Sequence, residues 1–338
     1  MSDTFDRVAG DQIPGGRDYQ EDAFQLTQLH RSGEDALLLL LADGMGGHIG
    51  GARASELAVA TFEARFNRSE GELLARLRDA LEAANDAIAK DAASDPRFAE
   101  MGCTLVACLI DGNQLHWISV GDSPLWHLGA EGIARLNADH SMRPVLEDLV
   151  EMGRMSQEEL DHDPRVNQLR SALIGEPLSM VDQNEEPFML NEDDRIVIAS
   201  DGLESLSAGR IGGICQEHEE PQQAVKALLE SIEELDRPGQ DNTTVIVYRH
   251  TSAGSVGERL QQKEASTVRN SAPTGAAKAE PESDSEPEDD VPSAAEAEAG
   301  TEPDSTQASG GLEQQPPTTQ VTETTAQRKS FLQRLFGR

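Results

Sequence analysis

The sequence predicts an α+β fold in which helices cover antiparallel β-sheets. Short segments with the alternation or β-branched content of strands are interspersed with longer segments of helical period. Residues 103–110 and 114–120 are joined by Asp111-Gly112-Asn113, which favours a tight hairpin and therefore antiparallel pairing. Two long helical segments, 51–66 and 69–93, follow each other directly. Hairpins beside adjacent helices are typical of helices packed on antiparallel sheets rather than of alternating βαβ units.

The expected elements follow one another along the first 250 residues. Strands are predicted at 36–42, 103–110, 114–120, 124–128, 186–190, 195–200 and 243–249. Helices are predicted at 51–66, 69–93, 143–152 and 221–235. The segment 36–42 contains five consecutive leucines, and its length suits one buried strand rather than a membrane span. About 250 residues suffice for one domain with a full hydrophobic core.

The composition changes near residue 251, after the last predicted strand. Residues 252–327 contain no Phe, Trp, Tyr or Ile and are rich in Pro, Ser, Thr and Glu. Such a segment buries too little apolar surface to offset a backbone entropy cost of about 1–2 kcal/mol per residue. We therefore expect a folded domain at 1–251, a disordered acidic linker at 252–327 and a basic amphipathic segment at 328–338.

The charge of the chain excludes several classes of partner. It has 62 acidic and 28 basic residues, a formal net charge of −34, and most of the excess lies in residues 1–251. Binding to nucleic acid or an anionic membrane needs a cationic surface, so we expect no nucleic-acid partner and no stable membrane insertion. The first residues lack a signal-peptide pattern, and Cys103, Cys108 and Cys215 form no C-x-x-C pair. These features predict a cytoplasmic protein.

Several carboxylates directly follow or precede predicted strands. Any one of them could simply close a turn, but a sheet-based core would bring them to one edge. Carboxylates gathered in this way repel each other by roughly 4 kcal/mol per pair at 4 Å and an effective dielectric constant near 20. A cation is therefore expected among them. The residues concerned are Asp43-Gly44, Asp122, Asp201-Gly202 and Asp241-Asn242. A fifth acidic site, Glu21-Asp22, follows Gly15-Gly16-Arg17 instead.

Oxygen ligands of this kind predict Mg²⁺ or Mn²⁺, because the chain lacks paired cysteines and a His-x-x-x-His motif. Two such ions produce a hydroxide and bind the oxygens of an in-line phosphoryl displacement, so a phosphate ester is the natural substrate. Arg17, four residues before Glu21, is a candidate for bidentate phosphate contact. Taken alone, Arg17 is more readily explained as a surface charge.

At these residues, the sequence resembles the metal-dependent serine/threonine protein phosphatases (the PPM, or type 2C, family) in their bacterial form. The matching segments occur in the family's order between about residues 7 and 249. They are GRDYQEDA at 16–23, ADGMGGH at 42–48, GCTL at 102–105, VGDS at 120–123, DHS at 139–141, LIG at 173–175, SDGL at 200–203 and DNTT at 241–244.

The resemblance implies a two-sheet antiparallel β-sandwich flanked by helices, with the metals at one end of the sandwich. It implies hydrolysis of phosphoserine and phosphothreonine on proteins by a metal-bridging hydroxide, without a phosphoenzyme. It also implies phosphoprotein substrates and a cognate serine/threonine kinase as partners. Residues 141–170 resemble the mobile flap beside the family's active site.

The resemblance also implies a role for each site residue. Asp43 corresponds to the carboxylate that bridges two ions, with the Gly44 carbonyl and Glu21 on one ion and Asp201 and Asp241 on the other. Asp22 corresponds to a holder of metal-bound waters, and Arg17 to the phosphate-binding arginine. Asp122 corresponds to the residue that, with Asp201, binds a third and weaker ion in bacterial members.

Three positions depart from the family's pattern or stay open. Met45 stands where many eukaryotic members have a histidine, so the general acid is unassigned; His48 fits either proton transfer or a structural role. Pro124 stands where an arginine usually follows Gly-Asp-Ser. No metal ligand is lost, although such a loss would favour the alternative of a non-catalytic phosphoprotein-binding or scaffold member of the same fold.

Other readings are less well supported. The Cys-x₅-Arg motif of cysteine phosphatases is absent, and the glycine-rich segment 44–50 does not fit the dinucleotide fingerprint. In 328–338, Phe331, Leu332, Leu335 and Phe336 share one helical face among four basic residues. This segment fits a frayed end, docking on a protein partner, or weak contact with a membrane surface.

Overall fold

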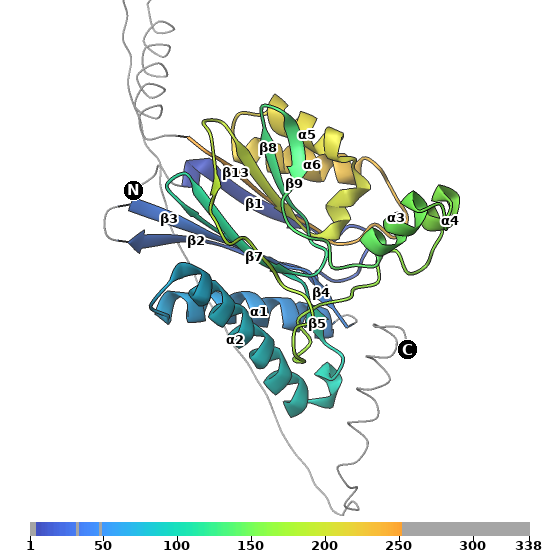
Figure 1. Ribbon diagram of the computed structural model, residues 1–338, viewed down its shortest axis with the longest axis horizontal. Helices are drawn as coiled ribbons and strands as arrows, with labels where there is room; N and C mark the ends of the chain where they lie inside the picture. The colour runs from blue at the N-terminus through green and yellow to red at the C-terminus, as the bar shows by residue number, and fades with distance from the viewer. Residues whose placement is uncertain (1–4, 32–33, 47–48, 252–338) are drawn as a thin grey trace, which may run out of the picture. The chain divides into compact units, whose positions relative to one another are not determined.

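Two antiparallel sheets face each other in the computed structural model, which describes residues 5–31, 34–46 and 49–251 (Figure 1). The first sheet has the order β1-β13-β12-β8-β9. Its strands are β1 Val8–Ile13, β13 Thr243–Arg249, β12 Arg195–Ala199, β8 Leu125–Gly129 and β9 Gly132–Arg135. The second sheet has the order β10-β7-β6-β3-β2, with β11 also paired to β7. Its strands are β10 Asp182–Gln183, β7 Gln114–Val120, β6 Leu105–Asp111, β3 Glu34–Ala42, β2 Ala23–Arg31 and β11 Phe188–Met189.

Helices cover the outer faces of both sheets, which confirms the predicted sandwich (Figure 1). Helices α1 Ile49–Arg68 and α2 Leu73–Ser94 pack on the second sheet, and α5 Ala208–Glu217 and α6 Pro221–Glu233 pack on the first. The short helices α3 Arg143–Glu151 and α4 Gln157–Asp161 lie between β9 and β10 in the sequence. A small third sheet pairs β4 Gly44–Met45 with β5 Gly102–Cys103. Within the described residues, no helix has both the length and the apolar character needed to cross a membrane.

The leucine strand β3 explains why the two sheets stay together. Successive side chains of a strand point to opposite faces, so Leu38 and Leu40 pack against α1 and α2, whereas Leu37, Leu39 and Leu41 pack between the sheets. All five are at most 2% exposed. A strand buried on both faces needs an uninterrupted apolar sequence, and this is what the predicted strand contains.

The predicted hairpin forms with a slightly different turn. Asp111 still belongs to β6 and pairs with Gln114, so the turn is Gly112-Asn113 alone. Gly112 has φ 60°, as the first central residue of a type II′ turn requires, and glycine adopts this conformation without steric cost.

Several elements lie outside the predicted set. Strand β1 is short and contains glycine and aspartate, and α5 contains three glycines, so their local propensities are weak. Tertiary packing stabilises them instead, since Ile211, Ile214 and Cys215 of α5 are buried against the first sheet. Helix α2 begins at Leu73 rather than 69, after Gly71 with φ 107°.

Candidate metal centre

The predicted carboxylates come together at one end of the sandwich because the strands that carry them run antiparallel. Ala23 of β2 pairs with Ala42 of β3, which places Glu21 and Asp22 beside Asp43. Ala199 of β12 pairs with Val245 of β13, so the end of one strand and the start of the other bring Asp201 near Asp241. Asp122 follows β7 at the same end, and the negative charges of Asp22, Asp201, Asp122 and Asp241 all act on Asp43.

Asp43 and Gly44 lie in a tight backbone arrangement. The Asp43 amide donates to Thr104 Oγ1 at 3.0 Å, and the Thr104 amide donates to the Asp43 carbonyl at 2.8 Å. A Cβ atom added at Gly44 would lie 2.3 Å from the carbonyl oxygens of both Glu21 and Gly51. Only glycine fits here, because three backbone segments approach each other closely. This close approach keeps Glu21 next to Asp43 and the start of α1.

Asp22 is buried, at 6% exposure. Its Oδ2 accepts hydrogen bonds from Ser200 Oγ and Thr244 Oγ1, both at 2.7 Å. Its Oδ1 has no donor among the described residues, and the adjacent Asp43 carboxyl can donate only when protonated. Burial and then the charge of Asp241 raise the pKa of Asp22 to about 6, against the hydrogen bonds from Thr244 and Ser200.

The other buried carboxyls are shifted in the same direction. Burial and the charges of Asp241 and Asp22 raise the pKa of Asp201 to about 7. Burial and the charges of Asp201 and Asp139 raise the pKa of Asp122 to about 8. Burial, followed by its acidic neighbours, raises the pKa of Asp43 well above its usual range. A cluster with this shortage of positive charge, made of hard oxygen donors, fits divalent cations such as Mg²⁺ or Mn²⁺.

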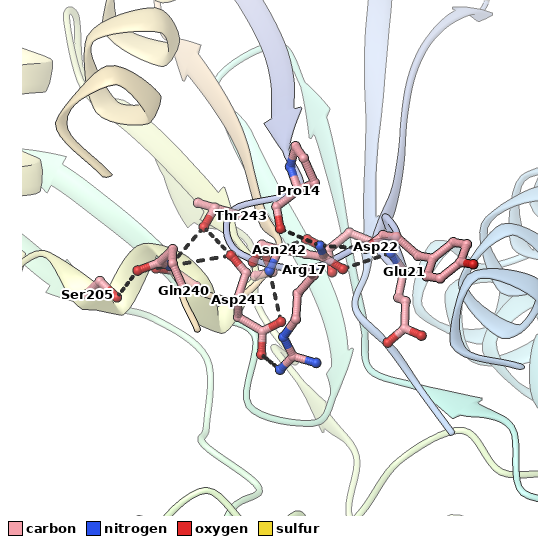
Figure 2. A network of polar contacts seen from close by, with 12 residues as sticks. Pro14, Arg17, Glu21, Asp22, Ser205, Gln240, Asp241, Asn242 and Thr243 are labelled. Carbon is pink, nitrogen blue, oxygen red and sulfur yellow. Dashed lines mark hydrogen bonds and ion pairs between the residues drawn. The ribbon is translucent and has the colours of Figure 1, made fainter. Parts of the chain in front are cut away.

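Arg17 lies at the edge of this cluster and pairs with Asp241. Its Nη2 donates to Asp241 Oδ2 at 2.6 Å, and both side chains are substantially exposed (Figure 2). The two groups therefore neutralise each other in this arrangement. Within the part of the chain that the structure describes, no three Asp, Glu, His or Cys side chains already surround one point as ligands of one ion.

Asn242 connects the two halves of the site (Figure 2). Its Oδ1 accepts from the Glu21 amide at 2.8 Å, and its Nδ2 donates to the carbonyls of Pro14 and Tyr19, each at 2.9 Å. The loop that carries Arg17 and Glu21 is thereby fixed beside Asp241. This role of Asn242 was not predicted, although its place in the Asp-Asn-Thr-Thr motif was a signal that could have indicated it.

Gln240 fixes the same region to the 3₁₀ helix η3 Asp201–Ser205. Its Nε2 donates to the Gly202 carbonyl at 3.0 Å, and its Oε1 accepts from Ser205 Oγ at 2.8 Å (Figure 2). Four residues that were not predicted hold the predicted acids in position. They are Gln240, Ser200, Thr244 and Thr104.

The predicted flap, 141–170, adjoins the cluster. Its base is closed by an isolated bridge between Ser141 and Leu169, and α3 and α4 bury one side chain each, Leu146 and Leu160. A hollow of about 180 Å³ lies between flap residues such as Arg143 and the acids Asp122, Asp201 and Glu204. His48 and the segments 252–327 and 328–338 lie outside the described residues.

Comparison with known proteins gives one consistent result. A model of the family described as Protein phosphatase 2C matches residues 16–210. Serine/threonine protein phosphatase PstP of Mycobacterium tuberculosis is 33% identical over 218 residues, covering 63% of this chain and 40% of that protein. Serine/threonine phosphatase stp of Listeria monocytogenes is 33% identical over 174 residues, covering 50% and 67% of the two chains. This chain thus spans less than half the length of the mycobacterial relative.

Solved structures agree with these sequence relatives. The crystal structure of the M. tuberculosis phosphatase PstP/Ppp superposes with a TM-score of 0.60 at 31% identity, over 72% of this chain and 98% of that one. The catalytic domain of PstP in complex with two manganese ions superposes with a TM-score of 0.58 at 30% identity, over 73% and 98%.

Proposed function

The chain belongs to the protein phosphatase 2C family, and from this premise we propose that it is a metal-dependent protein serine/threonine phosphatase. Its reaction is the hydrolysis of phosphoserine and phosphothreonine esters on proteins. The observation that carries the proposal is that carboxylates from four strand ends, two in each sheet, converge on Asp43. Among the described charged groups that most strongly affect the pKa values of Asp43 and Asp201, the exposed Arg17 is the one cation.

We propose the ligand set that the family resemblance implies. Asp43 would be shared by two ions, Glu21 and the Gly44 carbonyl would complete one site, and Asp201 and Asp241 would complete the other. When bound, Mn²⁺ or Mg²⁺ ions supply the positive charge that polarises a phosphoester and acidifies water at neutral pH. The PstP catalytic domain, which is 30% identical, is described in complex with two manganese ions, which supports a site for two ions.

The protein groups around the ions have their own tasks. The guanidinium fork of Arg17 can bind two oxygens of a phosphate group. The contact of Arg17 with Asp241 keeps the guanidinium at the edge of the acidic cluster. Asp22 offers the buried Oδ1 as an acceptor for an ordered water, while Ser200 and Thr244 fix its other oxygen. Asp122 and Asp201 face the hollow under the flap and are the candidates for a third, weaker ion.

We further propose that residues 1–251 form the catalytic domain, because every strand and helix that carries the site lies between Phe5 and Arg249. Phosphorylated proteins are the expected substrates, and a serine/threonine kinase acting on the same proteins is the expected partner. The alternative of a non-catalytic phosphoprotein-binding member is less well supported, because each proposed ligand position retains its carboxylate or carbonyl.

Hydrolysis of p-nitrophenyl phosphate and of a phosphothreonine peptide tests the proposal. We expect turnover that needs Mn²⁺ or Mg²⁺, stops with chelator and is lost in Asp43→Ala and Asp241→Ala, while circular dichroism shows a retained fold. Turnover that survives metal removal would refute the metal-dependent reaction. Phosphopeptide binding without turnover under any metal would instead establish the non-catalytic alternative.

A further inference from the structure

Arg135, at the end of β9, links the two segments that carry Asp122 and Asp201. Its side chain is 22% exposed, and its Nη2 donates to the backbone carbonyl of Asp122 at 2.6 Å. Its Nε donates to Asn137 Oδ1 at 3.2 Å. Its Nη1 lies 3.5 Å from the Glu204 carboxylate, and Glu204 belongs to η3, which begins at Asp201. One guanidinium group therefore contacts both sides of the hollow under the flap.

The loop 121–124 is held by both backbone and side-chain hydrogen bonds. The His140 amide donates to the Gly121 carbonyl and the Ala199 amide donates to the Pro124 carbonyl, each at 3.1 Å. The Gly121 amide donates to His140 Nδ1 at 3.2 Å, and Asn137 Nδ2 donates to the Ser123 carbonyl at 2.9 Å. At Asp122 itself, Arg135 donates to the backbone carbonyl. The backbone at Asp122 is thus held by a donor at the end of β9.

We propose that Arg135 is a positioning residue that holds Asp122 opposite Asp201 and thereby sets the affinity of this pair for a divalent cation. The inference rests on the proposed function only in taking Asp122 and Asp201 as ligands. Groups that hold a metal ligand in place commonly change metal affinity 10–100-fold when they are removed. A planar guanidinium suits this task because it donates in several fixed directions at once.

The positive charge of Arg135 could instead weaken cation binding by repulsion. The contacts favour positioning, because the short 2.6 Å hydrogen bond goes to a neutral carbonyl. The carboxylates of Asp139 and Glu204, at 3.6 and 3.5 Å, lie at the distance of loose ion pairs and offset the charge of the guanidinium. The two explanations predict opposite effects of removing Arg135.

Isothermal titration of the full chain with Mn²⁺ distinguishes them. The relevant binding step is the one that Asp122→Asn removes. We expect Arg135→Gln to weaken this step about 10–100-fold. We expect Arg135→Lys, which keeps the charge but loses the fork, to be nearly as weak. Arg135→Gln should cause no further loss in a chain that already carries Asp122→Asn.

Arg195→Gln is the matched control. Arg195 is buried, whereas Arg135 is partly exposed, and like Arg135 it donates to a backbone carbonyl at 2.6 Å, that of His218. It begins β12, whose opposite end at Ala199 lies about 13 Å away at a strand rise of about 3.3 Å per residue, and Asp201 follows two residues beyond that end. We expect Arg195→Gln to lower the melting temperature and leave Mn²⁺ affinity unchanged.

Unchanged or tighter Mn²⁺ binding in Arg135→Gln would overturn the proposal, as would an equal loss in Arg195→Gln or additive effects with Asp122→Asn. If Arg135→Gln does not fold, Arg135→Lys decides the question by the same criterion. The titration requires no turnover, so a chain that fails to hydrolyse phosphopeptides but shows the Arg135 dependence would refute the proposed function and leave this inference standing.

Discussion

Replacing Gly44 by alanine tests whether the close approach of three backbone segments builds the metal centre. The added Cβ would lie 2.3 Å from the carbonyl oxygens of Glu21 and Gly51, whereas ordinary contact begins at 3.4 Å. Each neighbour would have to move by about 1 Å, and both are backbone atoms rather than ends of flexible side chains. Overpacking costs about 1–3 kcal/mol, and we expect the upper end of this range because the obstacle is rigid on two sides. For a domain of this size, 3 kcal/mol corresponds to a melting temperature lower by about 6–12 °C.

Gly213→Ala, in α5, is the matched control for this substitution. No atom lies within 4 Å of a Cβ added there, and alanine in a helix is more favourable than glycine by about 1 kcal/mol. Thermal unfolding followed by circular dichroism should therefore show opposite shifts for the two variants. Titration with Mn²⁺ should show weaker binding for Gly44→Ala alone. If Gly44→Ala melted and bound Mn²⁺ like the original chain, the close approach at this position would have no bearing on the centre.

Three further predictions concern the same end of the sandwich. Without divalent ions, the domain should gain stability as the pH falls from 8 to 5.5. The folded-state pKa values of Asp22 (about 6) and Asp201 (about 7) exceed the usual unfolded value of about 3.9. The folded state therefore binds more protons than the unfolded state in this pH window. Melting curves should show this slope and its loss with saturating Mn²⁺; a stability that rises with pH in the metal-free chain would contradict it. Asn242→Ala should cost about 2–3 kcal/mol in urea unfolding, because it removes one acceptor and two donors and leaves the Glu21 amide unpaired; a loss below about 0.5 kcal/mol would argue against this role. Arg17→Lys should raise KM for a phosphothreonine peptide about tenfold, since the bidentate fork is lost. Arg165→Lys, at an exposed ion pair of the flap, should leave KM unchanged. Equal effects of the two substitutions would rule out phosphate contact by Arg17.

The placement of the acids could be predicted because each strand leads directly into its carboxylate. The leucine strand ends one residue before Asp43, and β12 ends two residues before Asp201, so an antiparallel sheet core was enough to bring them to one end. The prediction of two sheets came from the order of the family's motifs rather than from the predicted strands, since β1 and β2 were not predicted at all.

The groups that orient the acids could not be predicted, because their contacts join distant parts of the chain. Ser200 and Thr244 reach Asp22 across 178 and 222 residues. Serine and threonine at these positions are also ordinary strand-end residues, so local patterns give no reason to single them out. The pairing of Arg17 with Asp241, 224 residues away, is likewise a product of the folded sheet order.

The uneven burial around the site has a consequence for local opening. Asp43 follows the leucine strand, which is buried on both faces, whereas α3 and α4 in the flap bury one side chain each. Regions with few buried apolar contacts open at low free-energy cost, while central strands open only with global unfolding. Amide hydrogen exchange should therefore be fast in 143–161 and slowest in 36–42. The hollow beside Asp122 can therefore widen through fluctuations of the flap, while the strand ends that carry the carboxylates keep their geometry.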